Sequence, residues 1–262
     1  MGIYMISSTS NVKVKNIINL KKSARARNES RCFLVEGPRM FFEVPSCRLK
    51  EVYLTPDFEK KYAGRLEGYR YELISESICR HLSDTQTPQG VVAVVERVER
   101  SIDDILRADP LPCLILLEDL QDPGNLGTIM RTAEASGVTG IIMNRGSVDP
   151  YNPKVIRSTM GAVFRIPFLV AENFPSVIRE LKDKGVTIYA AHLQGEVFYD
   201  ADYTKACGFL IGNEGKGLKD ETAALADLRI RIPMKGQIES LNASVAASLI
   251  MYEAMKQRLK TE

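Results

Sequence analysis

The sequence predicts an α/β protein in which a small α/β domain precedes a larger domain built on a parallel sheet. Three observations carry this prediction. The 262-residue chain is 45% hydrophobic and 26% charged, a composition typical of globular proteins. Apolar runs of strand length alternate with helix-compatible segments, and in the second half these runs are almost wholly apolar. A charged stretch ending in two prolines separates the halves.

The first domain is predicted over residues 1–97. Its N-terminal segment, SNVKVKNIINLKKSARARNES, places Val14, Ile17 and Ile18 at helical spacing among basic residues, which predicts an amphipathic helix. Helix-compatible pieces separate the short strands that follow, which we expect at 32–37, 51–55, 70–74 and 90–96. Residues 98–111 are predicted to form the linker, because they hold one helical turn of apolar residues and resist regular structure toward their end.

The second domain is predicted over residues 112–262. We expect its strands at 114–118, 140–144, 186–191, 208–212 and 228–232. The helical segments between and after them are expected at 126–136, 152–163, 174–184, 218–226 and 241–259. Nearly continuous apolar strands separated by helices indicate a parallel sheet covered on both faces.

The composition also excludes several kinds of protein. No apolar run reaches the roughly 18 residues of a membrane span, and residues 1–10 lack the pattern of a secretory signal, so we expect a cytoplasmic protein without membrane contact. Five scattered cysteines with no C-x-x-C spacing argue against a disulfide framework or a zinc site. With only two histidines in the chain, we expect no metal.

Positive charge is concentrated at the N-terminal end. Residues 1–31 hold seven Lys and Arg against Glu29 alone, a charge of +6, and the net charge of +2 leaves −4 for the rest. A basic segment is the usual electrostatic footprint of a nucleic-acid partner. A solvated basic helix without a partner is the alternative.

Parallel sheets bind ligands at the carboxyl ends of their strands, so the loops there decide function. The first such loop, in EDLQDPGNLGTIMRTAEASG (118–137), holds Asn125 at the predicted helix start and Arg131 about one and a half turns further in. Asn125 is expected to cap that helix. These residues alone also fit a capped helix with a surface arginine.

The second loop, IGNEGKGLKDE (211–221), follows a strand and opens a helix, as phosphate-binding loops do. Its glycines run in the reverse of the dinucleotide-binding order, and Lys216 is followed by glycine where a Walker loop has Ser or Thr. Because the Glu214 carboxylate would repel phosphate, a neutral or cationic ligand fits better. A glycine-rich turn with no ligand is the alternative.

The third loop, in RIPMKGQIESLNASVAAS (231–248), enters the last helix with Ser240 as the expected N-cap. Capping alone could account for Ser240. It does not account for three Asn- or Ser-rich turns at the same edge of one sheet.

Together, NLGTIMRTAEASG (125–137), IGNEGKGL (211–218) and IPMKGQIESLNASVAAS (232–248) resemble the three motifs of the SpoU-type (TrmH-like) RNA ribose 2'-O-methyltransferases. FLVEG (33–37) and TPQGVVAVV (87–95) resemble the substrate-binding domain that precedes the catalytic domain in many members. The resemblance covers the whole chain. It implies a SPOUT-type catalytic domain with a deep trefoil knot, preceded by a small RNA-binding domain.

The resemblance further implies S-adenosylmethionine as the cofactor and a homodimer with its active site at the subunit interface. The positions that match the family's catalytic set are Asn125, Arg131, Glu214, Ser240 and Asn242. The implied cofactor contacts are made by the backbone near Gly212, Ile232 and Leu241, with a loop from His192 to Gly195 closing over them. Replacing Gly212 by Val is expected to block the cofactor and leave the fold intact.

Methyl transfer to a ribose 2'-hydroxyl needs in-line approach and loss of the hydroxyl proton, and it needs no metal. A free guanidinium has a pKa above roughly 12 and is a poor base, so we expect Arg131 to clamp the neighbouring phosphate. Ser240 and Asn242 would then orient the hydroxyl or relay its proton.

The expected function is 2'-O-methylation of ribosomal RNA of the 23S type. Methylation of tRNA and a non-catalytic RNA-binding role are the alternatives. A Rossmann-type enzyme is disfavoured because no G-x-G-x-x-G follows any predicted strand.

Overall fold

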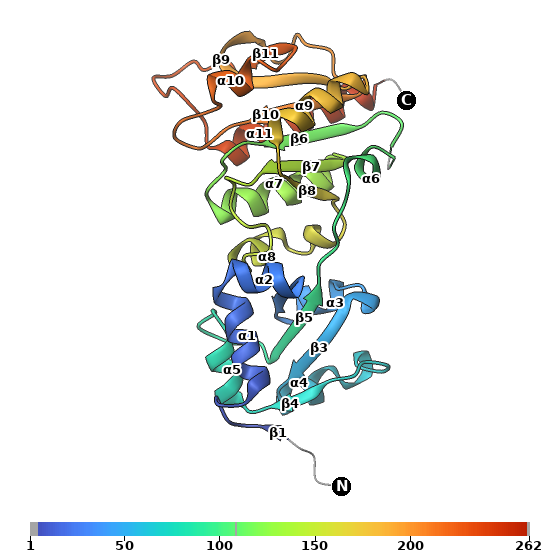
Figure 1. Cartoon of the computed structure of the whole chain (residues 1–262), viewed down its shortest axis with the longest axis vertical. Coiled ribbons are helices and arrows are strands. Elements are labelled where there is room, and N and C mark those ends of the chain that lie inside the picture. The colour runs from blue at the N-terminus through green and yellow to red at the C-terminus, as the bar shows by residue number, and fades with distance from the viewer. Residues whose placement is uncertain (1–4, 108, 261–262) are drawn as a thin grey trace. The chain divides into compact units, whose positions relative to one another are not determined.

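The structure is a computed structural model that describes residues 5–107 and 109–260 (Figure 1). The chain divides into two compact units, each discontinuous in sequence. The first comprises the residues up to Val98 together with Asp149–Phe164, and the second comprises Glu99–Val148 and the residues from Arg165 onward. Sequence analysis assigned 149–164 to the catalytic domain. The boundaries at 97 and 112 stay a prediction.

The first unit is built on a mixed five-stranded sheet with the order β1-β4-β3-β5-β2. Strand β5 runs antiparallel to both of its neighbours, whereas β4 pairs in parallel with β1 and β3. The strands are β1 (Met5–Ile6), β2 (Cys32–Glu36), β3 (Leu49–Leu54), β4 (Glu72–Ile74) and β5 (Val91–Glu96). The helices are α1 (Val12–Lys22), α2 (Ala24–Ser30), α3 (Pro38–Glu43), η1 (Ser46–Arg48), α4 (Pro56–Tyr62), η2 (Ala63–Arg65), α5 (Glu76–Leu82), α8 (Pro153–Thr159) and η3 (Ala162–Phe164).

The basic N-terminal segment forms two helices where sequence analysis expected one. Ser23 ends α1 in an extended conformation, and its side chain accepts a hydrogen bond from the Ala26 backbone N–H to cap α2. Of the three apolar residues predicted for this face, Val14 and Ile17 are buried in a core shared with α5, and Ile18 is half-buried against it. Leu20, which the prediction did not include, is buried in the same core. This segment is therefore part of the folded unit.

The second unit contains an all-parallel six-stranded sheet with the order β11-β9-β10-β6-β7-β8, which confirms the parallel sheet. The strands are β6 (Cys113–Leu117), β7 (Gly140–Asn144), β8 (Phe168–Ala171), β9 (Thr187–Val197), β10 (Cys207–Ile211) and β11 (Leu228–Arg231). The helices are α6 (Ile102–Leu106), α7 (Pro123–Ala135), α9 (Phe174–Asp183), α10 (Asp220–Ala223) and α11 (Ala243–Arg258). Sequence analysis missed β8, a short edge strand with three of its four residues only half-buried.

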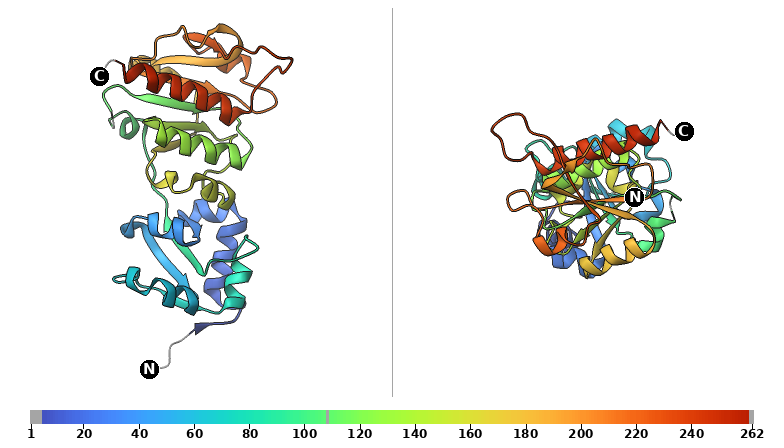
Figure 2. Two further views of the ribbon diagram at one scale, coloured as in Figure 1. Left: turned by 180° about the vertical axis from the view of Figure 1, so that it is seen from behind. Right: turned by 90° about the horizontal axis from the view of Figure 1, so that it is seen from above.

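Helices cover both faces of this sheet, as predicted (Figure 2). Helices α6 and α9 pack on one face against alternate strand residues such as Leu114, Leu116 and Leu210. Helices α7 and α11 contact each other and lie on the opposite face. Among the described residues, no helix is both long and apolar enough to span a membrane.

The C-terminal end of α11 is held by its last residue. The Arg258 guanidinium donates hydrogen bonds to the backbone oxygens of Leu111, Tyr203 and Lys205 at 2.7–2.9 Å. These contacts attach the helix to the segments that lead into β6 and β10. The opposite end of α11 is thereby directed to the carboxyl edge of the sheet.

A candidate active site at the carboxyl edge of the parallel sheet

Three loops meet where strands β6, β10 and β11 end, because parallel neighbours bring their carboxyl ends to one edge. The first loop leads from β6 into α7, the second leads from β10 toward α10, and the third leads from β11 into α11. These are the loops that sequence analysis selected. Side chains from all three contact one another.

Helix α7 begins three residues earlier than expected, and this changes the role of Asn125. Pro123 occupies the first turn, and Asp122 is the N-cap, accepting a hydrogen bond from the Asn125 backbone N–H at 2.8 Å. The expectation that Asn125 caps the helix was therefore wrong. Its side chain, buried in the first turn, instead makes contacts with the other two loops.

The Glu214 carboxylate is bound at the N-terminus of α7. It accepts hydrogen bonds from the backbone N–H of Asp122 at 2.9 Å, from that of Gln121 at 3.1 Å and from Asn125 Nδ2 at 3.0 Å. Burial alone would raise the pKa of Glu214, but the hydrogen bonds from Asn125 and the backbone outweigh it and the pKa is lowered. Glu214 is therefore ionised at neutral pH. Its hydrogen bonds attach the loop after β10 to the start of α7.

Asn125 links Glu214 to the third loop. Its Oδ1 accepts a hydrogen bond from Asn242 Nδ2 at 3.0 Å. Asn242, and not Ser240 as expected, is the N-cap of α11: its Oδ1 accepts from the Ser244 backbone N–H at 2.9 Å. The chain from Glu214 through Asn125 to Asn242 thus connects the three motifs.

A pocket of about 420 Å³ opens beside this chain of hydrogen bonds. Four of the five predicted cofactor residues line it, namely His192, Gly212, Ile232 and Leu241. Two predicted catalytic residues, Glu214 and Ser240, line the same pocket. Its wall includes the apolar side chains of Phe198, Ile211, Ile230, Met234 and Ile250.

The two predicted glycines in this region stand where the chain approaches itself closely. A Cβ at Gly212 would lie 2.2 Å from the backbone of Gly217 and Leu218, so Gly212→Val would displace the loop. The expectation that this change leaves the fold intact was therefore wrong. A Cβ at Gly195 would lie 2.6 Å from the Arg229 backbone, and Gly195, on β9 beside β11, is outside the residues that line the pocket.

Arg131 and Ser240 are exposed and stand apart from the hydrogen-bonded chain. Neither side chain has a hydrogen-bond or ion-pair partner within residues 5–107 and 109–260. Arg131 projects from the middle of α7, and Ser240 precedes α11 at the rim of the pocket. Both side chains are available to a substrate.

Sequence analysis missed two residues that hold these loops together. Asn213 Nδ2 donates to the Asp119 backbone oxygen at 2.8 Å, and its Oδ1 accepts from the Lys216 backbone N–H at 3.0 Å. Hydrogen bonds from Lys219 and Asn144 lower the pKa of Asp119, which adopts a left-handed φ of 51°. The Asp-Pro pair at 122–123, typical of a helix start, was the available signal for the earlier start of α7.

The arrangement fits a group-transfer site that works by positioning. It combines a partly apolar pocket, an immobilised carboxylate, and two exposed polar side chains on neighbouring elements. Within the described part of the chain, no cluster of three His, Cys, Asp or Glu side chains could hold a metal ion.

Family models match both parts of the sequence. The model described as the SpoU rRNA methylase family matches residues 112–252, and the MRM3-like substrate binding domain matches residues 11–93. A 23S rRNA (guanosine(2553)-2'-O)-methyltransferase from Bacillus subtilis is 34% identical over 250 residues, which cover 94% of this chain and 97% of that protein.

Solved structures with the same fold carry a bound cofactor. The AdoMet-bound rRNA methyltransferase from Sinorhizobium meliloti superposes with a TM-score of 0.84 and 32% identity, over 97% of each chain. The SpoU methyltransferase AviRb from Streptomyces viridochromogenes, in complex with AdoMet, superposes with a TM-score of 0.85 and 30% identity, over 95% of this chain and 98% of the other. The similarity therefore extends over both units.

Proposed function

The chain belongs to the SpoU rRNA methylase family. From this membership we propose that it transfers a methyl group from S-adenosylmethionine to a ribose 2'-hydroxyl of ribosomal RNA. We propose 23S-type ribosomal RNA as the substrate. The observation that carries the proposal is the chain of hydrogen bonds from Glu214 through Asn125 to Asn242 beside a cofactor-sized pocket. It brings three separate motifs into one site.

The residues of the pocket fit this cofactor. A volume of about 420 Å³ lies within the usual range for small-molecule sites. Apolar side chains such as Ile230 and Ile250 offer a surface for an adenine ring, and Gly212 lets the loop backbone approach closely. When bound, the cofactor supplies an electrophilic methyl group on a positively charged sulfur.

We assign different roles to the polar residues. The exposed guanidinium of Arg131 clamps a phosphate next to the target ribose, as its planar fork of donors suits. Ser240, exposed at the pocket rim, orients the 2'-hydroxyl and relays its proton to solvent water as the O–CH₃ bond forms and the bond from sulfur to the methyl group breaks. Glu214, Asn125 and Asn242 position the three loops, because their hydrogen-bonding groups are already engaged with one another.

The site is completed by a second copy of the chain. Val245, Leu249 and Tyr252 project at i, i+4 and i+7 from α11, each between 40% and 48% exposed. With Thr128 of α7 they line a shallow groove of about 270 Å³. Thr128 and Arg131 lie three residues apart on α7 and hence on one side of it. A homodimer formed through this groove would place Arg131 at the interface.

We assign the roles of the two parts of the chain from the two family matches. Residues 1–97 select the RNA and residues 112–262 carry out the chemistry, within the deep trefoil knot that the resemblance implies. The exposed cations of the first unit support this division. Because ribosomal RNA is the substrate, we place the enzyme in the cytoplasm.

The test is methyl transfer from labelled S-adenosylmethionine to an unmodified 23S rRNA transcript and, separately, to total tRNA. Mass-spectrometric mapping should find a single 2'-O-methylated nucleotide in the 23S transcript. Methylation of tRNA alone would favour the tRNA alternative. Cofactor and RNA binding without transfer to either RNA would indicate a non-catalytic RNA-binding protein.

A further inference from the structure

The lysines of α1 differ in what they contact. Lys13 forms an ion pair with Glu72, and Lys21 pairs with Asp84 and donates to the backbone oxygens of Leu82 and Ser83 at the end of α5. Lys15 and Lys22 are exposed and have no partner among the residues that the structure describes. Two of the four lysines thus have structural contacts, and the other two have none with the residues that the structure describes.

Lys15, Asn19 and Lys22 lie at i, i+4 and i+7 and therefore form one stripe along α1. The helix contains no acidic residue. Two turns separate the two ammonium groups, a rise of roughly 10 Å along the axis. We define this set as the α1 stripe.

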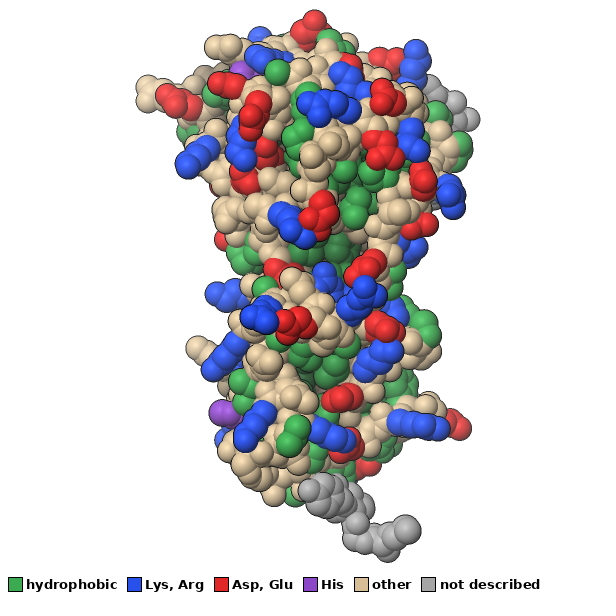
Figure 3. All heavy atoms as spheres, viewed as in Figure 1, with side chains coloured by type: hydrophobic (Ala, Val, Ile, Leu, Met, Phe, Trp, Pro, Cys, Tyr) green, Lys and Arg blue, Asp and Glu red, His purple; other side chains and the backbone are tan. Residues whose placement is uncertain are grey.

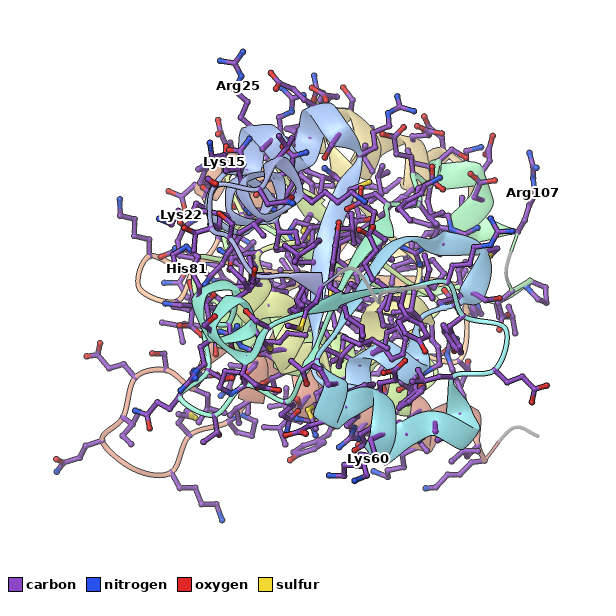
Figure 4. The ribbon with its side chains drawn as sticks, turned by 90° about the horizontal axis from the view of Figure 1, so that it is seen from below. Lys15, Lys22, Arg25, Lys60, His81 and Arg107 are labelled. Carbon is purple, nitrogen blue, oxygen red and sulfur yellow. The ribbon has the colours of Figure 1, made fainter. Side chains whose placement is uncertain are left out.

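Neighbouring helices place further polar side chains beside α1. Helix α2 adds Arg25, whose ion pair with Glu29 is highly exposed and hence weak. Helix α5, which packs against α1, adds His81. Seen from below in Figure 4, Lys15, Lys22, Arg25 and His81 lie along one side of the first unit, and Lys60 lies elsewhere on it.

Some other lysines of this unit have acidic residues nearby. On α4, Lys60 and Lys61 follow Asp57 and Glu59 within a single seven-residue helix. Lys50 pairs with Glu96. On the face of the second unit seen in Figure 3, basic and acidic side chains are intermixed. The α1 stripe is therefore distinguished by two exposed lysines, unpaired among the described residues, on a helix that has no acidic side chain.

We propose that the α1 stripe is a docking site for the sugar-phosphate backbone of the substrate RNA. This inference rests on the proposed function. Two ammonium groups roughly 10 Å apart along the helix can each contact a phosphate of the RNA, and the Asn19 amide can donate to or accept from a ribose hydroxyl. A membrane surface does not fit, because the apolar face of α1, with Val14, Ile17 and Leu20, is buried in the core.

The test compares two double charge reversals, Lys15→Glu with Lys22→Glu and the matched control Lys60→Glu with Lys61→Glu. Both replace two exposed helical lysines and change the net charge equally. Binding of an unmodified 23S rRNA transcript is measured by filter retention over a series of salt concentrations. Melting curves and S-adenosylmethionine binding verify that each variant is folded.

The α1 variant should bind the transcript at least tenfold more weakly, and the slope of log K against log salt should fall by about 1.4 to 1.8, for two lost phosphate contacts. The control should stay within twofold of the wild type. Lys15→Gln with Lys22→Gln should show the same loss of slope without added repulsion.

Equal weakening by both reversals would overturn the proposal, since it would reflect net charge alone. Unchanged binding of the α1 variant by a wild-type-like methyltransferase would also overturn it and leave the proposed function standing. A different outcome is that the wild type binds RNA more tightly than the α1 variant and yet transfers no methyl group. That result would overturn the proposed function and support the proposal that the α1 stripe binds RNA. A wild-type protein that does not bind the transcript would overturn both.

Discussion

At the scale of single residues, the site separates side chains that are already engaged from side chains that are available. Glu214, Asn125 and Asn242 satisfy one another's hydrogen bonds. Arg131 and Ser240 are exposed, with no partner in the described ranges. Substitutions in the first group should act through structure as well as activity, and substitutions in the second should act on activity alone.

Arg131→Ala should lower turnover by roughly 100-fold or more and leave the melting temperature and the affinity for S-adenosylmethionine unchanged, because the lost contact belongs to the transition state. Arg131→Lys keeps the charge without the planar fork and should restore activity only partly. Single-turnover methylation, calorimetry and melting curves on the same proteins measure these effects. Arg179→Ala, an exposed arginine on α9, is the control. Near-normal turnover of Arg131→Ala would remove this residue from the mechanism.

Glu214→Gln should destabilise the protein by about 1–3 kcal/mol at pH 7, since an amide –NH₂ would face backbone donors that now bind a carboxylate. The pKa of Glu214 is lowered in the folded state, so its stabilisation is present above the unfolded pKa of about 4.3 and is lost as the pH falls through the folded value. The difference in unfolding free energy between the wild type and Glu214→Gln should therefore decrease toward acid pH.

Denaturant unfolding at pH 7, 4 and 3 would measure this difference, because the stabilisation is lost only below the unfolded pKa of about 4.3. Glu239→Gln provides the matched control, because Glu239 lines the same pocket as an exposed side chain without a resolved hydrogen bond. If the difference in unfolding free energy stayed constant across this pH range, ionisation of Glu214 would not be what stabilises the loop.

At the scale of elements, α1 combines a structural face with an exposed one. Ile17 is fully buried beside Ile78 and Leu82 of α5, and Val12 is 71% exposed. Deleting residues 1–31 would therefore remove core side chains together with the charge. Such a truncation cannot measure RNA contacts by itself.

Ile17→Ala should lower the unfolding free energy of the first unit by about 2–5 kcal/mol, and Val12→Ala should change it by less than about 0.5 kcal/mol. Denaturant titrations followed by circular dichroism measure both. Deletion of residues 1–31 should abolish the cooperative unfolding transition of the first unit. If Ile17→Ala were as stable as the wild type, α1 would be a peripheral helix, and the truncation would become a clean test of RNA binding.

Element boundaries show where sequence reasoning succeeded. Alternation of apolar runs located β6, β7, β10 and β11 to within one residue or so, because buried parallel strands are almost wholly apolar. It missed β8, a short strand at the sheet edge. It also placed both functional helix starts on the wrong capping residue, since several capping side chains compete within each of these loops.

At the scale of the whole molecule, we expect methyl transfer to depend on the proposed dimer. Tyr252→Glu should convert the protein to a monomer and abolish methyl transfer, because it introduces a charge into the apolar groove of α7 and α11. Light scattering after size-exclusion chromatography measures the mass. Tyr199→Glu, at a similarly exposed tyrosine outside the groove, should leave the mass unchanged. A dimeric Tyr252→Glu protein would show that the copies meet elsewhere.

Local patterns in the sequence were enough to predict the α/β class, the parallel sheet, the basic helical segment and the residues of the three motifs. Each of these depends on periodicity, charge or spacing over a short stretch of the chain. The tertiary structure alone decided how those motifs meet. Glu214 reaches the start of α7 across more than 90 residues because β10 lies beside β6 in the sheet. Asn242 reaches Asn125 across 117 residues because α11, which it caps, packs against α7. Strand order depends on long-range packing, which no local pattern specifies.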